Sequence, residues 1–167
     1  MLDDVRKQLT QTVSRGSVVM QGTMQQMLSQ PGSGRIYVRT KAGRKRAKGM
    51  SIFGAALKAS MEAAARGKAK SLRALGFHQA SAPGEPPAVD TGTLRRAVQI
   101  DDSELRGKQV IRNRIGTALP YAKWLEFGTA RMAPRPWARP SLVKVEPTFV
   151  DEVRRTVAAI TKKYGGK

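Results

Sequence analysis

Two long segments, one near each end of the chain, carry apolar residues at steps of three or four, and this helical periodicity constrains the fold more than any other feature. The first covers residues 2–28 and ends before Gln30-Pro31-Gly32-Ser33-Gly34, where proline and glycine disfavour a helix. The second follows Pro140, with apolar residues at Leu142, Val145, Phe149, Val153, Val157, Ile160 and Tyr164. We predict two long helices, with Pro147 kinking or restarting the second. In the first, we interpret Met20, Met24 and Met27 as core in preference to a partner-facing groove.

The residues between these helices have the pattern of short strands and turns. Residues 35–39 alternate like a strand, and residues 108–117 alternate in the same way behind a strand-like segment at 97–100. The break at Asp101-Asp102-Ser103 predicts that the last two strands pair as neighbours. The expected fold class is therefore α+β, with a small antiparallel sheet flanked by the long N-terminal and C-terminal helices in one domain over residues 1–167.

Proline and glycine mark the irregular connections. Residues 78–89 contain three prolines and one glycine and are expected to be extended, after which Asp90 or Thr91 caps a short helical turn. Residues 120–127 begin with proline and predict a short helix that ends at Gly128. The spacing of this helix predicts burial along one side for Tyr121, Trp124, Leu125 and Phe127. Residues 131–139 are predicted to form an ordered, proline-rich loop.

The chain is strongly basic, with 31 Lys and Arg residues against 12 Asp and Glu residues and a formal net charge of +19. The cations are concentrated in a basic insertion at residues 38–78, whose first part (41–49) is predicted to be a mobile loop and whose Ala-rich part (51–75) is predicted to be helical. One hypothesis is contact with DNA phosphates, and an equally weighted one is a solvated, self-repelling excursion. The candidate DNA-facing residues are Lys41, Arg44, Lys45, Arg46 and Lys48.

The residue types that catalysis needs are scarce. The absence of cysteine excludes thiol nucleophiles, thiolate metal sites and disulfides, and a single histidine excludes multi-His metal sites within one chain. His78 can be grouped with Ser81 and either Glu85 or Asp90, but the spacing fits no nucleophile elbow, so we interpret His78 as an ordinary loop residue. We expect no enzyme activity, no cofactor and no metal.

Two further patterns narrow the class of protein. The acidic run at 101–104 is interpreted as a turn, and no glycine pattern matches a phosphate-binding loop. No apolar run is long enough to span a bilayer and the first residues are acidic, so neither a membrane protein nor a secreted one is expected.

A cluster of aromatic and arginine residues is the strongest candidate for a binding surface, because Trp, Tyr and Arg dominate interface hot spots. The alternative, held at even odds on chemistry alone, is a small satellite core capped by Glu126 pairing with an arginine. The cluster consists of Tyr121, Trp124, Glu126, Phe127, Arg131, Arg135, Trp137 and Arg139.

Three stretches occur in a fixed order: Ala80-Ser81-Ala82-Pro83-Gly84-Glu85-Pro86-Pro87 continuing through Asp90-Thr91-Gly92-Thr93-Leu94-Arg95, then Tyr121-Ala122-Lys123-Trp124-Leu125-Glu126-Phe127-Gly128-Thr129, then Arg135-Pro136-Trp137-Ala138-Arg139-Pro140. Together they resemble a family of tail-component proteins of tailed bacteriophages, small proteins of the neck that complete the tail at its junction with the head. The resemblance covers residues 80–145, the two long helices and residues 33–37.

The resemblance implies a non-enzymatic structural protein of the virion, assembled in the host cytoplasm, whose copies form a ring at the neck in a tail-completion or tail-terminator role. A hexamer is the first expectation and a dodecamer the second. The partners implied are the head connector or head-completion proteins on one side and tail-tube proteins on the other, with no membrane.

The same resemblance suggests roles for individual residues. Asp90 caps the turn and Gly92 supplies backbone freedom, while Tyr121, Trp124 and Phe127 seat the short helix on the sheet. Glu126 pairs with Arg135 or Arg139 and braces the proline-rich loop against that helix or a neighbouring subunit. The expected interface or loop-bracing residues are Asp90, Thr91, Gly92, Tyr121, Trp124, Glu126, Phe127, Gly128, Thr129, Arg135, Pro136 and Trp137.

One departure from the family pattern is the basic insertion, about 40 residues between residues 33–37 and the stretch that starts at Ala80. We expect it to face DNA in the lumen of the ring in preference to an acidic neighbouring ring. The alternative function is a basic nucleic-acid-binding protein that contacts phosphate backbones, which explains the same net charge. The aromatic and arginine cluster favours the ring subunit.

Overall fold

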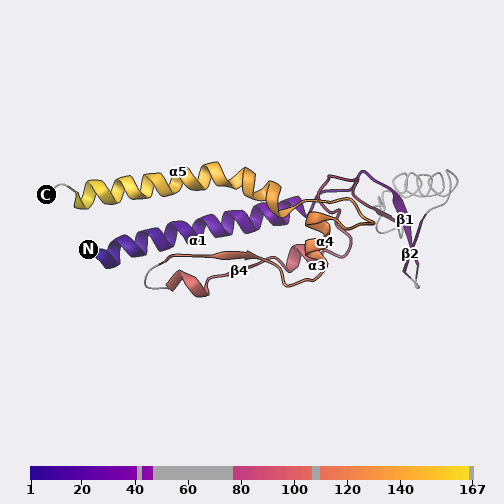
Figure 1. The fold of residues 1–167 in the computed structure, drawn as a ribbon, viewed down its shortest axis with the longest axis horizontal. Helices are drawn as coiled ribbons and strands as arrows, with labels where there is room; N and C mark the ends of the chain where they lie inside the picture. Colours follow the sequence, from indigo (N-terminus) through magenta and orange to yellow (C-terminus); the bar gives the residue numbers. More distant parts are fainter. Residues whose placement is uncertain (41–42, 47–76, 107–109, 166–167) are drawn as a thin grey trace, which may run out of the picture.

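A computed structural model describes residues 1–40, 43–46, 77–106 and 110–165 (Figure 1). Its spine is a pair of antiparallel helices, α1 (Leu2–Met27) and α5 (Ala138–Tyr164), which lie side by side with the two termini at the same end. Both predicted helices are confirmed. The prediction of a restart at Pro147 is wrong: α5 runs through this residue, which is exposed, so its ring meets no neighbouring element that would end the helix there.

Two small antiparallel sheets lie at different places along this spine. At the end far from the termini, β1 (Ile36–Thr40) pairs with β2 (Gly43–Arg46) and with β3 (Phe77–Gln79), in the order β2-β1-β3. The pair β4 (Gln99–Asp101) and β5 (Arg114–Gly116) lies along the middle of α1. The fold is α+β, as predicted, with its strands divided between two sheets.

Several local predictions differ from the structure. Residues 43–46 form β2 where a mobile loop was predicted, and His78 belongs to β3 where an irregular connection was predicted. In both cases pairing with β1 supplies backbone hydrogen bonds that a sequence pattern does not reveal. The strand predicted at 108–117 is confirmed only as the shorter β5, and a 3-10 turn, η1 (Ser103–Arg106), follows β4. The helix predicted at 51–75 lies outside the described residues.

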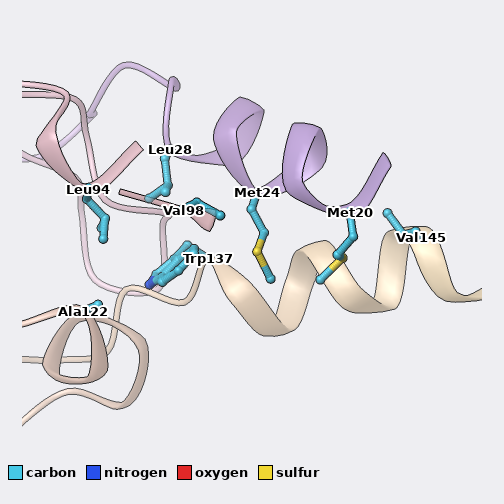
Figure 2. Close-up of a cluster of buried hydrophobic side chains, with 8 residues drawn as sticks. All are labelled: Met20, Met24, Leu28, Leu94, Val98, Ala122, Trp137 and Val145. Carbon is cyan, nitrogen blue, oxygen red and sulfur yellow. The ribbon is translucent and has the colours of Figure 1, made fainter. Parts of the chain in front are cut away.

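The main core sits where α1 ends and α5 begins. Trp137, only 4% exposed, lies among Leu28, Leu94, Val98 and Ala122 (Figure 2). The core continues between the two helices through three further buried residues, Met20, Met24 and Val145. The interpretation of the methionine stripe as core is confirmed for Met20 and Met24, whose flexible thioether side chains fill the space against α5.

Away from this core, α1 and α5 are joined by a narrow seam. Gly16 is buried where the Phe149 ring approaches so closely that an added Cβ would overlap it. The hydroxyls of Thr12 and Thr156 lie 3.0 Å apart and share a hydrogen bond. The absence of a side chain at Gly16 makes room for the Phe149 ring, and the paired threonines are small, so the two helices approach closely along this seam.

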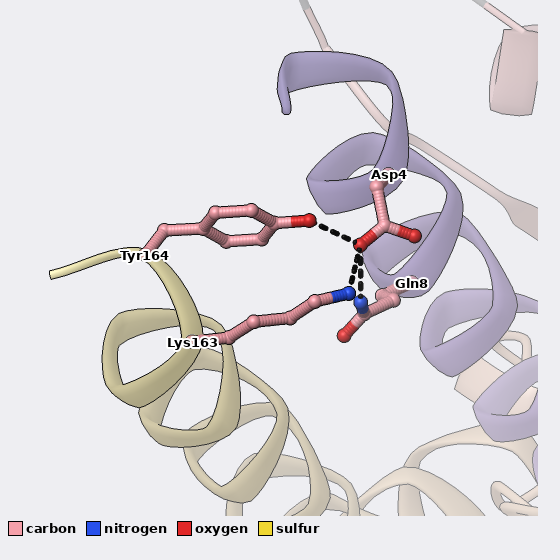
Figure 3. Close-up of polar contacts among 4 residues, drawn as sticks. All are labelled: Asp4, Gln8, Lys163 and Tyr164. Atoms are coloured by element: carbon pink, nitrogen blue, oxygen red, sulfur yellow. Dashed lines mark hydrogen bonds and ion pairs between the residues drawn. The ribbon is translucent and has the colours of Figure 1, made fainter. Parts of the chain in front are cut away.

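At the ends of the helices a polar cluster replaces the core (Figure 3). Asp4 Oδ2 accepts hydrogen bonds from the Tyr164 hydroxyl at 2.6 Å, the Lys163 ammonium at 2.9 Å and the Gln8 amide at 3.0 Å. The Tyr164 bond, followed by the Lys163 bond, lowers the pKa of the Asp4 carboxyl to about 2. The same carboxylate raises the pKa of Lys163.

Candidate functional site

The short helix α4 (Ala122–Phe127) carries three predicted site residues on its outer side. Ala122 is buried and Leu125 packs against the core, whereas Tyr121, Trp124 and Phe127 are 37%, 49% and 78% exposed. The prediction that these three aromatic residues seat the helix on the sheet is therefore wrong. In a six-residue helix the apolar spacing does not determine which side faces inward. Here the smaller side chains, Ala122 and Leu125, face inward. We call Tyr121, Trp124 and Phe127 the α4 aromatic face.

Glu126 projects from the inner side of α4 and caps α5. Its Oε2 accepts the backbone N–H groups of Trp137 at 2.7 Å and Ala138 at 2.9 Å, and its Oε1 accepts that of Arg139 at 2.9 Å. The first turn of α5 has no capping side chain of its own. A carboxylate also interacts favourably with the positive end of the helix dipole.

This geometry corrects the predicted ion pair between Glu126 and Arg135 or Arg139. The carboxylate does brace the proline-rich loop, as predicted, but it binds backbone amides instead of a guanidinium group. Because it bonds three consecutive residues of another helix, Glu126 fixes the position of α4 relative to α5.

Gly128 ends α4 and reverses the chain, with φ at +77°. An added Cβ would lie 2.7 Å from the Met132 carbonyl oxygen, so both the conformation and the space require glycine. Thr129 then forms a bridge with Met132, and the Arg135 N–H donates to the Leu125 carbonyl at 2.7 Å. The predicted loop is therefore ordered and packed against α4, with Pro136 half-buried beside Trp137.

Arg135 connects this loop to the proline-rich stretch that follows β3. Its Nε and Nη2 donate to the Ser81 carbonyl at 3.3 and 3.2 Å, and the Gly84 N–H donates to the Pro134 carbonyl at 3.0 Å. Ser33 donates through its hydroxyl to Glu85, and this bond, the largest contribution, lowers the pKa of the Glu85 carboxyl. Segments far apart in the sequence are thereby tied into one body beneath α4.

A pocket of about 310 Å³ opens between these segments. Five predicted site residues line it, Asp90, Thr91, Gly92, Tyr121 and Arg135, together with His78 and Ser81. His78 is buried, with Nδ1 3.6 Å from Asp90 Oδ1, so it is not the ordinary loop residue that was predicted. The structure therefore brings the first and second stretches of the resemblance together around one cavity.

The cap of α3 (Thr93–Arg96) also differs from the prediction. Its N-cap is Gly92, with φ at +74°, and no side chain caps the helix, so Asp90 does not have the predicted role. The predicted backbone freedom of Gly92 is confirmed. Thr91 contributes a local turn, because its Oγ1 accepts the Thr93 N–H at 3.3 Å.

The predicted DNA-facing residues are divided. Lys41 and Lys48 lie outside the described residues. The backbone of Arg44, Lys45 and Arg46 forms β2, in the hairpin at the end of the molecule opposite the termini (Figure 1). The strand register places Arg39 opposite Arg44.

The structure also contains an apolar trough that the sequence reasoning missed. Its floor is α1 and its walls are α5 and residues 111–115, which lead into β5, and it encloses about 660 Å³. We call it the α1–α5 trough; its apolar lining includes Val13, Ile111, Ile115, Leu142, Phe149 and Val150. Within α5, Leu142 and Val150 are exposed beside the apolar residues that face α1. The apolar side of this helix is therefore wider than contact with α1 alone requires, and this width is the sequence feature that could have predicted the trough.

No protein-family model, curated protein or solved structure matches this chain. Within the described ranges, no group of three or more His, Asp or Glu side chains is placed to hold a metal ion. Nor does that part of the chain contain a helix long and apolar enough to cross a membrane. The function must be argued from the surfaces themselves.

Proposed function

We propose that this chain is a structural subunit that assembles with copies of itself, as the ring-forming neck protein of a tailed bacteriophage that its three sequence stretches resemble. The observation that carries the proposal is the α4 aromatic face, where Trp124 and Phe127 are presented to solvent by a helix that is fixed from behind. In this role the protein is non-enzymatic and acts through its shape.

Rigidity is what makes this face suitable for binding. Aromatic side chains bury a large area, and an interface gains most from them when they are already held in place. Glu126 bonds α4 to α5, Gly128 fixes the turn behind it, and Arg135 bonds the following loop to Ser81. Each of these residues belongs to one of the stretches that carry the resemblance, so the stretches share one purpose in this proposal: to hold the aromatic face in position.

The net charge of the chain supports a second role in the same assembly or, as the alternative function, in a free nucleic-acid-binding protein. Phosphates of a nucleic acid fit a net charge of +19. In the ring, this charge would face packaged DNA in the lumen.

Light scattering behind size-exclusion chromatography tests the two roles. Nuclease-treated protein is measured at moderate and at high salt, with the absorbance ratio reporting bound nucleic acid. A ring subunit gives a closed multimer that survives high salt without nucleic acid, because its cohesion is mainly apolar. Monomers that hold nucleic acid and release it at high salt support the alternative instead.

A pair of variants connects the result to the aromatic face. The double change Trp124→Ser with Phe127→Ser is expected to abolish the multimer and leave the far-ultraviolet circular dichroism unchanged, since both side chains are exposed. Val19→Ser is the control, because Val19 is 52% exposed on α1, outside the aromatic face. A multimer that is unaffected by the double change would contradict the role given to α4.

A further inference from the structure

Two apolar features of the described residues have no partner within that part of the chain, and they differ in shape. The α4 aromatic face protrudes, with Phe127 the most exposed of its three residues. The α1–α5 trough is hollow, and its walls include Leu142 and Val150, which are exposed although they are aliphatic. The volume of the trough lies within the range of about 300–1,000 Å³ in which proteins hold compact apolar groups.

We propose that the aromatic face of one copy docks into the α1–α5 trough of the next copy, an inference that rests on the proposed function and names the surfaces of its subunit contact. The two surfaces belong to different parts of the chain, so the contact is heterologous. Each copy then offers one face to a neighbour and one trough to another, which is the arrangement that closes into a ring when the rotation between copies is right.

The occupant that we assign to the α1–α5 trough is a second copy of this chain. The trough cannot accept the aromatic face of its own chain, because Glu126 and Leu125 fix α4 against the core. A nucleic acid is a poor occupant, since the trough is apolar and Arg112 is the only cation among the described residues that line it. Arg112 is also paired, with Nη1 3.4 Å from Glu104 Oε2.

The charges near the two surfaces favour the same docking: basic residues lie near the aromatic face and an acidic residue lines the trough. Lys123, between Tyr121 and Trp124 of the aromatic face, and Arg131, which follows the face in the sequence, are exposed, and Lys123 Nζ lies 6.0 Å from the centre of the Trp124 ring. Glu146 lines the trough and has no ion pair within the described part of the chain. Copies of a chain with a net charge of +19 repel one another, so a local meeting of opposite charges at the contact is needed to orient them.

Cysteine cross-linking tests this pairing directly, because the natural chain contains no cysteine. The double variant Phe127→Cys with Val150→Cys places one thiol on the face and one in the trough. A short bismaleimide should convert it into a ladder of covalent multimers. The matched control is Phe127→Cys with Val143→Cys, because Val143 is 64% exposed on the same helix and does not line the trough.

The outcomes separate this inference from the proposed function. A ladder from the first variant, with none from the control, supports the docking. A multimer by light scattering that gives no ladder, or the same ladder from both variants, overturns the docking and leaves self-assembly standing. Covalent dimers from Phe127→Cys alone indicate that two aromatic faces meet each other, which also overturns it. A natural chain that stays monomeric by light scattering contradicts both.

A charge exchange gives a second readout that needs no cross-linker. Glu146→Lys and Lys123→Glu are each expected to weaken association about tenfold, because each places like charges across the contact. Combined in one chain, they should restore association. Failure of the double variant to recover, when each single variant is folded by circular dichroism, overturns the orientation proposed here.

Discussion

The two ends of the α1–α5 pair are held together by different forces. At the junction with the strands, Trp137 is buried among aliphatic side chains and Glu126 caps the first turn of α5. At the termini, Asp4 bonds Lys163 and Tyr164 on the surface, where solvent screens ion pairs and their contribution to stability is small. The difference indicates that the junction determines whether the chain folds, while the far ends of the helices open locally without global unfolding.

The largest effect is expected from the junction core. Trp137→Ala should lower the free energy of unfolding by about 4 kcal/mol, because it removes a fully packed aromatic ring and leaves a cavity. Equilibrium unfolding in urea measures this loss. Val143→Ala is the control and should change stability by about 0.5 kcal/mol or less, since that side chain is 64% exposed and lies outside both proposed contact surfaces. Equal losses would show that the junction is not the main core.

The cap of α5 comes next. Glu126→Ala should cost about 2 kcal/mol, because three backbone N–H groups lose their acceptor. Glu126→Gln keeps one oxygen acceptor and should cost less. Lys144→Ala, an exposed change on the same helix outside the trough, serves as the control in the same urea titrations. If Glu126→Ala were as stable as the control, the capping contact would have no energetic role.

The seam between the helices should show a smaller effect. Gly16→Ala forces the Phe149 ring away from α1 and is expected to cost about 1–2 kcal/mol. Gly22→Ala lies on the same helix with open space around the new methyl group, and it should stabilise the chain by about 0.5 kcal/mol. Thermal unfolding distinguishes the two variants by the sign of the change in Tm. A gain in Tm for Gly16→Ala would mean that the helices are not in close contact there.

The smallest effect belongs to the terminal cluster and depends on pH. The Asp4 pKa is lowered from 3.8 to about 2 in the folded chain, so this carboxylate stabilises the fold above the unfolded value. The stabilisation is lost as the pH falls from 3.8 towards about 2. Hydrogen exchange should show faster opening of the ends of α1 and α5 across this interval. Asp4→Asn should open at all pH values and lose that dependence, while amides around Trp137 stay protected in both proteins.

Much of the fold could be predicted from the sequence because the two long helices repeat one signal over many residues. The bounds of α1 and α5 follow from apolar spacing and from the glycines and prolines beyond their ends. The shorter elements gave weaker signals. In α4, Leu125 packs against the core as predicted, but the burial predicted for Tyr121, Trp124 and Phe127 is wrong, because Leu125 pairs with Ala122 on the inner side of the helix.

The role of Glu126 could have been found with one more step. The residues before α5, Arg135-Pro136-Trp137, include no Ser, Thr, Asp or Asn to cap it, so the helix needs an acceptor from elsewhere. Glu126 is the only acidic residue between Glu104 and Glu146. The contact of His78 with Asp90 had no such signal, because it depends on β3 pairing with β1.

The cap that Glu126 places on α5 also couples the motion of α4 to the motion of α5. A helix of this length extends about 40 Å from its first turn. Because the carboxylate couples α4 to that first turn, a small rotation of α4 would tilt the axis of α5 about its first turn. The displacement at Tyr164 would exceed that at Trp137 many times over, so strain applied to the aromatic face would be transmitted along α5 to the opposite end of the molecule.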